Sequence, residues 1–207
     1  MQARDIDYRC DDINLRGYLA LDENATGKRP GVLVFHEGLG LGEFAMERAR
    51  RLAALGYVAL AADMFGDRRQ ASNLQQVATL VGGLRAEPEK LRARGRAALA
   101  TLAALPQVDA TRLAAIGFCF GGSVVLELAR EGADLKAVVS FHGVLATKLP
   151  AQPGRVKASV LVCTGVDSAG AAGATRRFRE RDARRRRKGL ADHRLRQHAA
   201  RLHQPRR

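Results

Sequence analysis

The sequence predicts an α/β protein in which a mostly parallel sheet is flanked by helices. Short apolar runs alternate with longer segments of helical spacing, and glycine and proline mark many of the ends. Several apolar runs are continuous rather than alternating, which is typical of strands buried on both faces. The 207 residues are enough for one domain with a two- or three-layer core.

The first elements expected are a hairpin, two buried strands and the helix between those strands. Strand-like stretches around Asp11-Asp12 predict the hairpin over residues 5–21. The runs at 31–35 and 57–61 read GVLVF and YVALA, and both predict buried strands. Gly56 ends the intervening helix, whose apolar residues recur at helical spacing as Met46, Ala49, Leu52, Ala53 and Leu55.

The second half continues the alternation. Helices are expected over 72–84 and 88–105, the latter with Pro88 in its first turn and Pro106 just past its end. Strands are expected over 113–116, 137–141 and 159–164, with an amphipathic helix at 123–130 between the first two. Such alternation implies parallel strands, whose carboxyl ends gather the reacting groups at one edge.

The pentapeptide Gly117-Phe118-Cys119-Phe120-Gly121 lies between an expected strand and an expected helix. A nucleophile on such a turn has a strained backbone, and flanking glycines remove side chains that would clash there. The positive end of the following helix favours the thiolate of Cys119 over the thiol. The pattern therefore predicts a nucleophile elbow. The alternative is a glycine-rich turn with a buried structural cysteine.

Acyl transfer also needs an oxyanion hole, which an elbow builds from two backbone N–H groups. One is expected from Phe120, the residue after the nucleophile. The other is expected from Gly38 or Leu39, in the loop that leaves the strand at 31–35.

Other polar residues follow the expected strands. His36 and Glu37 follow the first buried strand, Asp63 the second, His142 the strand at 137–141 and Asp167 the last. Simpler explanations exist for three of them. His36 and His142 suit packed histidines at the core edge better than bases, and Asp63 suits a turn cap.

Charge is divided unevenly along the chain. Residues 1–167 hold 21 Lys/Arg against 18 Asp/Glu, a net +3, whereas residues 168–207 hold 14 against 3, a net +11. The tail includes Arg184-Arg185-Arg186-Arg187, and such a composition predicts disorder or a frayed helix. A basic arm for nucleic acid is the alternative function, which predicts salt-sensitive binding. We do not expect nucleic acid as a partner.

Composition restricts the other classes. No apolar run approaches a membrane span and the N-terminus lacks secretory-signal features, so a cytoplasmic protein without a membrane partner is expected. Three cysteines, Cys10, Cys119 and Cys163, lack C-x-x-C spacing, which argues against a disulfide framework and a zinc site. A redox or metal role for Cys119 would need one of the other two nearby.

The strings VFHEGLGLGEF, RLAALGYVALAADMFGD, AAIGFCFGGSVVLELA and VVSFHG resemble the dienelactone hydrolase family of the α/β-hydrolase fold, over residues 5–167. The resemblance implies hydrolysis of small lactones or carboxylic esters, as by a carboxymethylenebutenolidase, through a Cys-His-Asp triad without cofactor or metal. It makes Cys119 the nucleophile and Glu37 the partner of its thiol. Asp167 is the position implied for the triad acid, although the family has two adjacent acids there. It leaves the oligomeric state open.

The resemblance stops near Asp167, and a change of reading frame accounts for the break. Codons for residues 190–205 (LADHRLRQHAARLHQP), read from their second base, can encode WRITVYGNTRHAFTN, which looks like the family's terminal strand and histidine loop. The same shift permits family-like segments over 168–174 and 176–186. We therefore expect an incomplete hydrolase domain at 1–167 and an off-frame tail at 168–207.

The frame change would remove the catalytic base. Its codon would straddle those of Ala200 and Arg201, so His193, His198 and His203 are by-products of the shifted frame. Loss of a triad member costs several orders of magnitude in rate, so weak or absent activity is expected. The C-terminal strand and helices of the fold would also be missing.

Overall fold

A computed structural model describes residues 1–165 of the chain. Its centre is a seven-stranded sheet in the order β1-β2-β4-β3-β5-β6-β7. The strands are β1 (Gln2–Cys10), β2 (Ile13–Leu21), β3 (Arg29–Phe35), β4 (Val58–Ala62), β5 (Val108–Phe118), β6 (Ala137–Phe141) and β7 (Ser159–Cys163). Asp167 and the tail at 168–207, for which we predict an off-frame sequence, lie outside the described residues.

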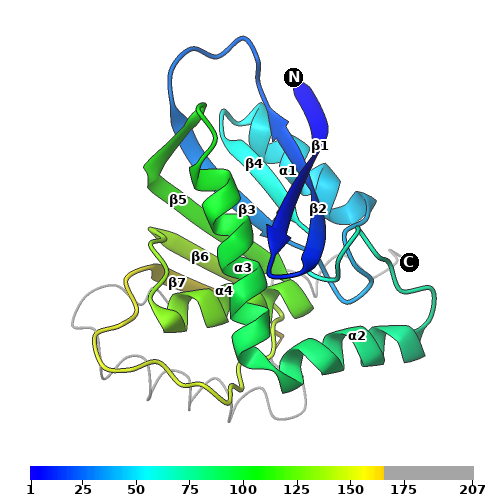
Figure 1. Cartoon of the computed structure of the whole chain (residues 1–207). Coiled ribbons are helices and arrows are strands. Elements are labelled where there is room, and N and C mark those ends of the chain that lie inside the picture. Colours follow the sequence, from blue (N-terminus) through cyan, green and yellow to red (C-terminus); the bar gives the residue numbers. More distant parts are fainter. Residues whose placement is uncertain (166–207) are drawn as a thin grey trace, which may run out of the picture.

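Helices cover both faces of this sheet (Figure 1). The helices are α1 (Glu43–Ala54), α2 (Leu74–Ala86), α3 (Pro88–Ala103) and α4 (Phe120–Glu131). Strand β3 shows how the faces divide: Val34 packs in the cluster that includes α1, whereas Leu33 and Phe35 pack in the cluster that includes α3 and α4. The predicted α/β architecture with a mostly parallel sheet is confirmed. Among the described helices, none combines the length and apolar character needed to cross a bilayer.

Helix α1 packs unusually small side chains against the sheet. Its buried Ala45, Ala49 and Ala53 share a cluster with small residues of β2 and β4. Alanines on both sides allow a close approach of helix and sheet, and larger side chains such as Leu41 and Leu52 pack around this contact. The opposite face holds the larger apolar residues, among them Phe35, Phe120 and Leu128.

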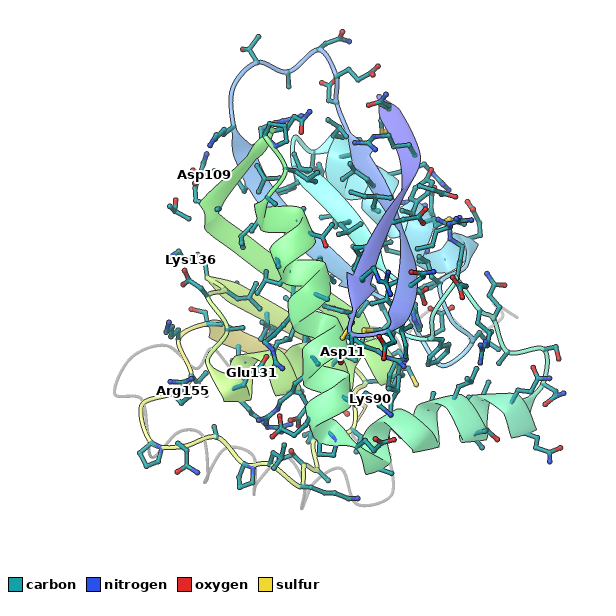
Figure 2. The ribbon with its side chains drawn as sticks, in the orientation of Figure 1. Asp11, Lys90, Asp109, Glu131, Lys136 and Arg155 are labelled. Carbon is teal, nitrogen blue, oxygen red and sulfur yellow. The ribbon has the colours of Figure 1, made fainter. Side chains whose placement is uncertain are left out.

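The parallel strands place their carboxyl ends at one edge. Strands β4, β3, β5, β6 and β7 pair in parallel, whereas β1 pairs with β2 and β2 with β4 in antiparallel fashion. Asp109, near the start of β5, and Lys136, just before β6, mark the opposite, amino-end edge (Figure 2). Every candidate residue within 1–165 that follows a parallel strand is thereby brought to one side of the molecule.

Two elements differ from the sequence-based expectation. Strand β5 begins at Val108 rather than at 113, because a register irregularity between Pro30 and Gly31 lets β3 pair with Val108 and Asp109 as well. The helix expected as amphipathic over 123–130 is α4, which starts at Phe120 and is buried on all sides through Arg130. Its polar residues form ion pairs inside the protein instead of facing solvent.

Candidate active site

Cys119 lies on the sharp turn between β5 and α4, as the sequence predicted. Its φ of 50° and ψ of −107° are strained for a residue with a side chain. A Cβ at Gly117 would come within 2.0 Å of the Gly121 carbonyl oxygen, and a Cβ at Gly121 within 2.3 Å of the Phe35 carbonyl oxygen. Glycine is therefore required on both sides of Cys119. The cysteine itself is half-buried and forms no disulfide within residues 1–165.

Two backbone hydrogen bonds fix this turn to the neighbouring strand ends. The Cys119 N–H donates to the Phe141 carbonyl at the end of β6 (2.9 Å). The Gly121 N–H donates to the His36 carbonyl just after β3 (3.0 Å). The strained turn is thus held from both adjacent strands, which fixes the backbone position of Cys119.

The two residues expected to form the oxyanion hole lie on α4 and on the loop after β3. Phe120 is the first residue of α4, so its N–H has no acceptor within the helix. Gly38 lies in the turn after β3, and a Cβ there would come within 2.9 Å of Val77 Cγ1 on α2. Glycine at 38 therefore allows α2 to pack against this loop.

His36 is a buried, neutral histidine that organises the loop. Its Nε2 accepts a hydrogen bond from the Met64 N–H (3.2 Å), so the ring proton is on Nδ1 and is donated to the Glu37 carbonyl (2.6 Å). Burial lowers the pKa of His36, although the hydrogen bond to Glu37 opposes this effect. The ring also lies edge-on to Phe65 and tilted against Phe120. The interpretation of His36 as a packed core-edge residue is confirmed.

Glu37 follows His36 in the same loop and is half-buried. Its Oε2 atom is buried and has no hydrogen-bond partner within residues 1–165. A buried carboxylate oxygen without a donor is costly unless a donor such as a thiol arrives. The hydrogen bond between Gly121 and His36 brings the Glu37 loop to the start of α4, where Cys119 is the N-cap.

Asp63 is a turn cap, as the sequence analysis suggested. Its carboxylate accepts four backbone N–H bonds, from Arg16, Phe65, Gly66 and Arg68. His142, in contrast, is not packed in the core as expected. It is exposed, it has a φ of 43°, and its N–H donates to the Cys163 carbonyl (2.7 Å). Asp167, the residue expected as the triad acid, lies outside the described residues.

Two residues that the sequence did not single out support this edge. The Tyr8 hydroxyl donates to the Asp63 carbonyl (3.0 Å), and the buried Arg94 donates from Nη1 to the Met64 carbonyl (2.5 Å). Burial raises the pKa of Tyr8, which keeps its hydroxyl protonated as a donor. Neither residue lies near the loop in sequence, so no local pattern could have indicated these contacts. No group of three or more His, Cys, Asp or Glu within 1–165 is placed to hold a metal ion.

Comparison with known proteins agrees with this geometry. The model of the dienelactone hydrolase family matches residues 15–200. The chain belongs to the dienelactone hydrolase family. Relatives include a putative carboxymethylenebutenolidase of Escherichia coli K12, 31% identical over 133 residues, which are 64% of this chain and 49% of that protein.

Two solved structures have a higher sequence identity to this member of the dienelactone hydrolase family. One, named m3DLH, is 47% identical with a TM-score of 0.81 and covers 88% of this chain and 78% of its own. The other is a dienelactone hydrolase-like promiscuous phosphotriesterase from metagenomic libraries, 44% identical, with a TM-score of 0.81 and coverage of 88% and 77%. The chain spans about half the length of the curated relative it matches.

Proposed function

We propose that the protein hydrolyses small lactones or carboxylic esters, with Cys119 as the nucleophile. The observation that carries the proposal is the strained, glycine-flanked backbone at Cys119, fixed to the ends of both neighbouring strands. Strain of this kind persists where the surrounding structure enforces it, and it is characteristic of active sites. Family membership and the carboxymethylenebutenolidase relative support the same substrate class.

The reaction begins at the Cys119 sulfur. Glu37 accepts the thiol proton, and the thiolate attacks the ester carbonyl carbon to form a carbon–sulfur bond. The negative charge on the carbonyl oxygen is stabilised by the N–H groups of Phe120 and Gly38. The carbon–oxygen bond to the alcohol then breaks, and the leaving alkoxide takes the proton held by Glu37, which restores the carboxylate. Water cleaves the resulting thioester, which releases the acid and regenerates Cys119.

The second half of this cycle needs a base for the water, and in the family that base is the triad histidine. We propose that the frame change has removed it and that Asp167 is the remaining candidate for the acid. The expected outcome is acylation of Cys119 followed by very slow release of the acid. Loss of one triad member costs several orders of magnitude in kcat.

The test uses 4-nitrophenyl acetate with the full chain and with Cys119→Ala. We expect a burst of 4-nitrophenol of about one equivalent, an acetyl group on Cys119 by mass spectrometry, and loss of both in Cys119→Ala. Cys163→Ala is the matched control, because Cys163 is another half-buried cysteine at the end of a parallel strand. The proposal is wrong if Cys119→Ala releases 4-nitrophenol as the parent does, or if Cys163→Ala abolishes the burst.

A further inference from the structure

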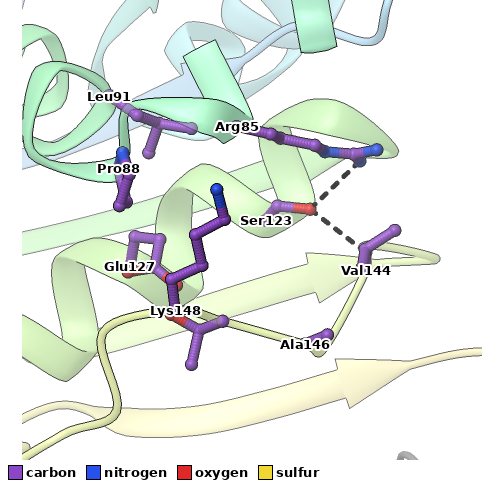
Figure 3. Close-up of a pocket in the computed structure, with 9 residues that line it drawn as sticks. Arg85, Pro88, Leu91, Ser123, Glu127, Val144, Ala146 and Lys148 are labelled. Carbon is purple, nitrogen blue, oxygen red and sulfur yellow. Dashed lines mark hydrogen bonds between the residues drawn. The ribbon is translucent and has the colours of Figure 1, made fainter. Parts of the chain in front are cut away.

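A pocket of about 280 Å³ that does not include Cys119 in its lining lies between the corner of α2 and α3, helix α4, and the loop from β6 to β7 (Figure 3). Its polar lining includes Arg85, Ser123 and Lys148, and its apolar lining includes Pro88, Leu91 and Val144. The volume is close to the lower end of the range of roughly 300–1,000 Å³ usual for small-molecule sites. The pocket therefore suits a compact ligand.

Two hydrogen-bond donors in this pocket, the Ser123 hydroxyl and Arg85 Nε, have no acceptor among the described residues. Ser123 is only 7% exposed, and its Oγ accepts from the Val144 N–H (3.1 Å) and from Arg85 Nη2 (3.4 Å). Both bonds use the hydroxyl oxygen as acceptor, and its proton has no acceptor within residues 1–165. Arg85 Nε is likewise buried without a partner in that range. A ligand that accepts hydrogen bonds would therefore satisfy both buried donors.

The charges in the pocket also favour a ligand that accepts hydrogen bonds. Lys148 extends toward the α2–α3 corner, where its Nζ donates to the Ala86 carbonyl (3.3 Å) and has no carboxylate partner within residues 1–165 (Figure 3). The one carboxylate of the lining, Glu127, is occupied by buried guanidinium groups, Arg92 on Oε2 and Arg130 on Oε1, each at 2.7 Å. Since Glu127 is fully paired, it does not neutralise Arg85 or Lys148, and the pocket favours an anion.

The apolar walls restrict which anion fits. Hydrocarbon surface is exposed in the pocket by Pro88, Leu91 and Val144. A fully hydrated inorganic ion would not bury this surface, whereas an anion with a hydrocarbon chain would. We propose that this pocket binds a short-chain carboxylate, with its carboxylate at Ser123 and Arg85 and its hydrocarbon chain against Pro88 and Leu91. Ser123 is one helical turn beyond Cys119, so the pocket lies beside the elbow. The proposal does not depend on the proposed hydrolysis.

The experiment is calorimetric titration of the full chain with hexanoate, with uncharged hexanamide as the matched ligand. We expect hexanoate to bind and hexanamide to give no measurable heat. The double variant that combines Arg85→Gln and Lys148→Gln should bind hexanoate at least tenfold more weakly than the parent. Lys90→Gln is the control, because Lys90 is an exposed lysine of α3 that pairs with Glu87 outside the pocket, and it should bind as the parent does.

Several outcomes would overturn the proposal. The first is that hexanamide binds as tightly as hexanoate. The second is that the double variant binds hexanoate as tightly as the parent. The third is that inorganic phosphate binds more tightly than hexanoate and that its binding is weakened equally by the loss of Arg85 and Lys148. If the double variant fails to unfold cooperatively, the exposed Lys148→Gln alone serves, with an expected loss of at least threefold. Cys119→Ala should retain hexanoate binding, so a failure of the hydrolase proposal and a failure of this one are told apart.

Discussion

At the scale of single residues, the backbone around Cys119 leaves no space for side chains at its flanking glycines. A Cβ at Gly121 would overlap the carbonyl groups of Phe35 and His36, which are backbone atoms and cannot rotate away. We therefore expect Gly121→Ala to lower the free energy of unfolding by at least about 2 kcal/mol, as overpacking of a rigid site does. Urea unfolding followed by circular dichroism measures this change.

The control for that substitution is Gly82→Ala on α2. Gly82 is exposed, and a Cβ there would have nothing within 4 Å. An alanine in an open helical position stabilises by about 0.5–1 kcal/mol relative to glycine. Equal effects of the two substitutions would show that the turn at Cys119 is less rigid than the contacts indicate.

His36 gives the protein a pH dependence of stability. Burial lowers its folded-state pKa below the ordinary value of about 6.5. Between the folded and unfolded pKa values the unfolded chain binds more protons, so stability is fully present above about pH 6.5 and falls as the pH drops toward the folded value. The slope approaches about 1.4 kcal/mol per pH unit for one proton.

The measurement compares urea unfolding of the parent and of His36→Gln between pH 8 and pH 5. Glutamine retains an acceptor and a donor but does not titrate. We expect the parent to lose more stability than the variant over this interval, because the remaining histidines are common to both proteins. Identical pH profiles would contradict the assignment of a buried, neutral His36.

At the scale of elements, a network of charges joins α3 to α4 inside the protein. Arg92 and Arg130 both donate to Glu127, and all three side chains are buried. We expect Glu127→Ala to lower the free energy of unfolding by about 3–5 kcal/mol, since it leaves two buried guanidinium groups without their carboxylate. Chemical denaturation at neutral pH tests this value.

Arg112→Ala provides the comparison for an exposed pair. Arg112 bonds Asp109 at 2.6 Å, but its side chain is 53% exposed, and pairs of this kind contribute less than about 1 kcal/mol. If both substitutions cost the same, the α3–α4 network is solvated rather than buried.

The sequence predicted the elements that depend on local patterns. Continuous apolar runs located β3 and β4 to within two residues at either end, and glycine spacing located the turn at Cys119. It did not predict that α4 is buried on all sides, because that burial depends on Arg92, which lies 35 residues before Glu127. The supports of the Asp63 loop were missed for the same reason: Tyr8 lies 55 residues away.

At the scale of the whole molecule, the sheet has two different edges. The β1 edge carries the charged Arg4, Asp5, Asp7 and Arg9, which discourage pairing with another strand. Strand β7, at the other end of the described sheet, is apolar and only half-buried from Val160 to Cys163. An edge of that composition is suited to a further strand, which is the element that the shifted frame would encode.

Restoring the predicted reading frame should therefore complete both the sheet and the triad. Deleting one base at the codons of Asp167 and Ser168 is expected to replace the basic tail with a sequence that includes WRITVYGNTRHAFTN. The new strand would cover β7 and the new histidine would act as base for thioester cleavage. We expect turnover of 4-nitrophenyl acetate to rise by about three to four orders of magnitude, because a triad member is regained. Coding DNA that cannot be read in this way, or a corrected chain that still stops after one burst, would contradict it.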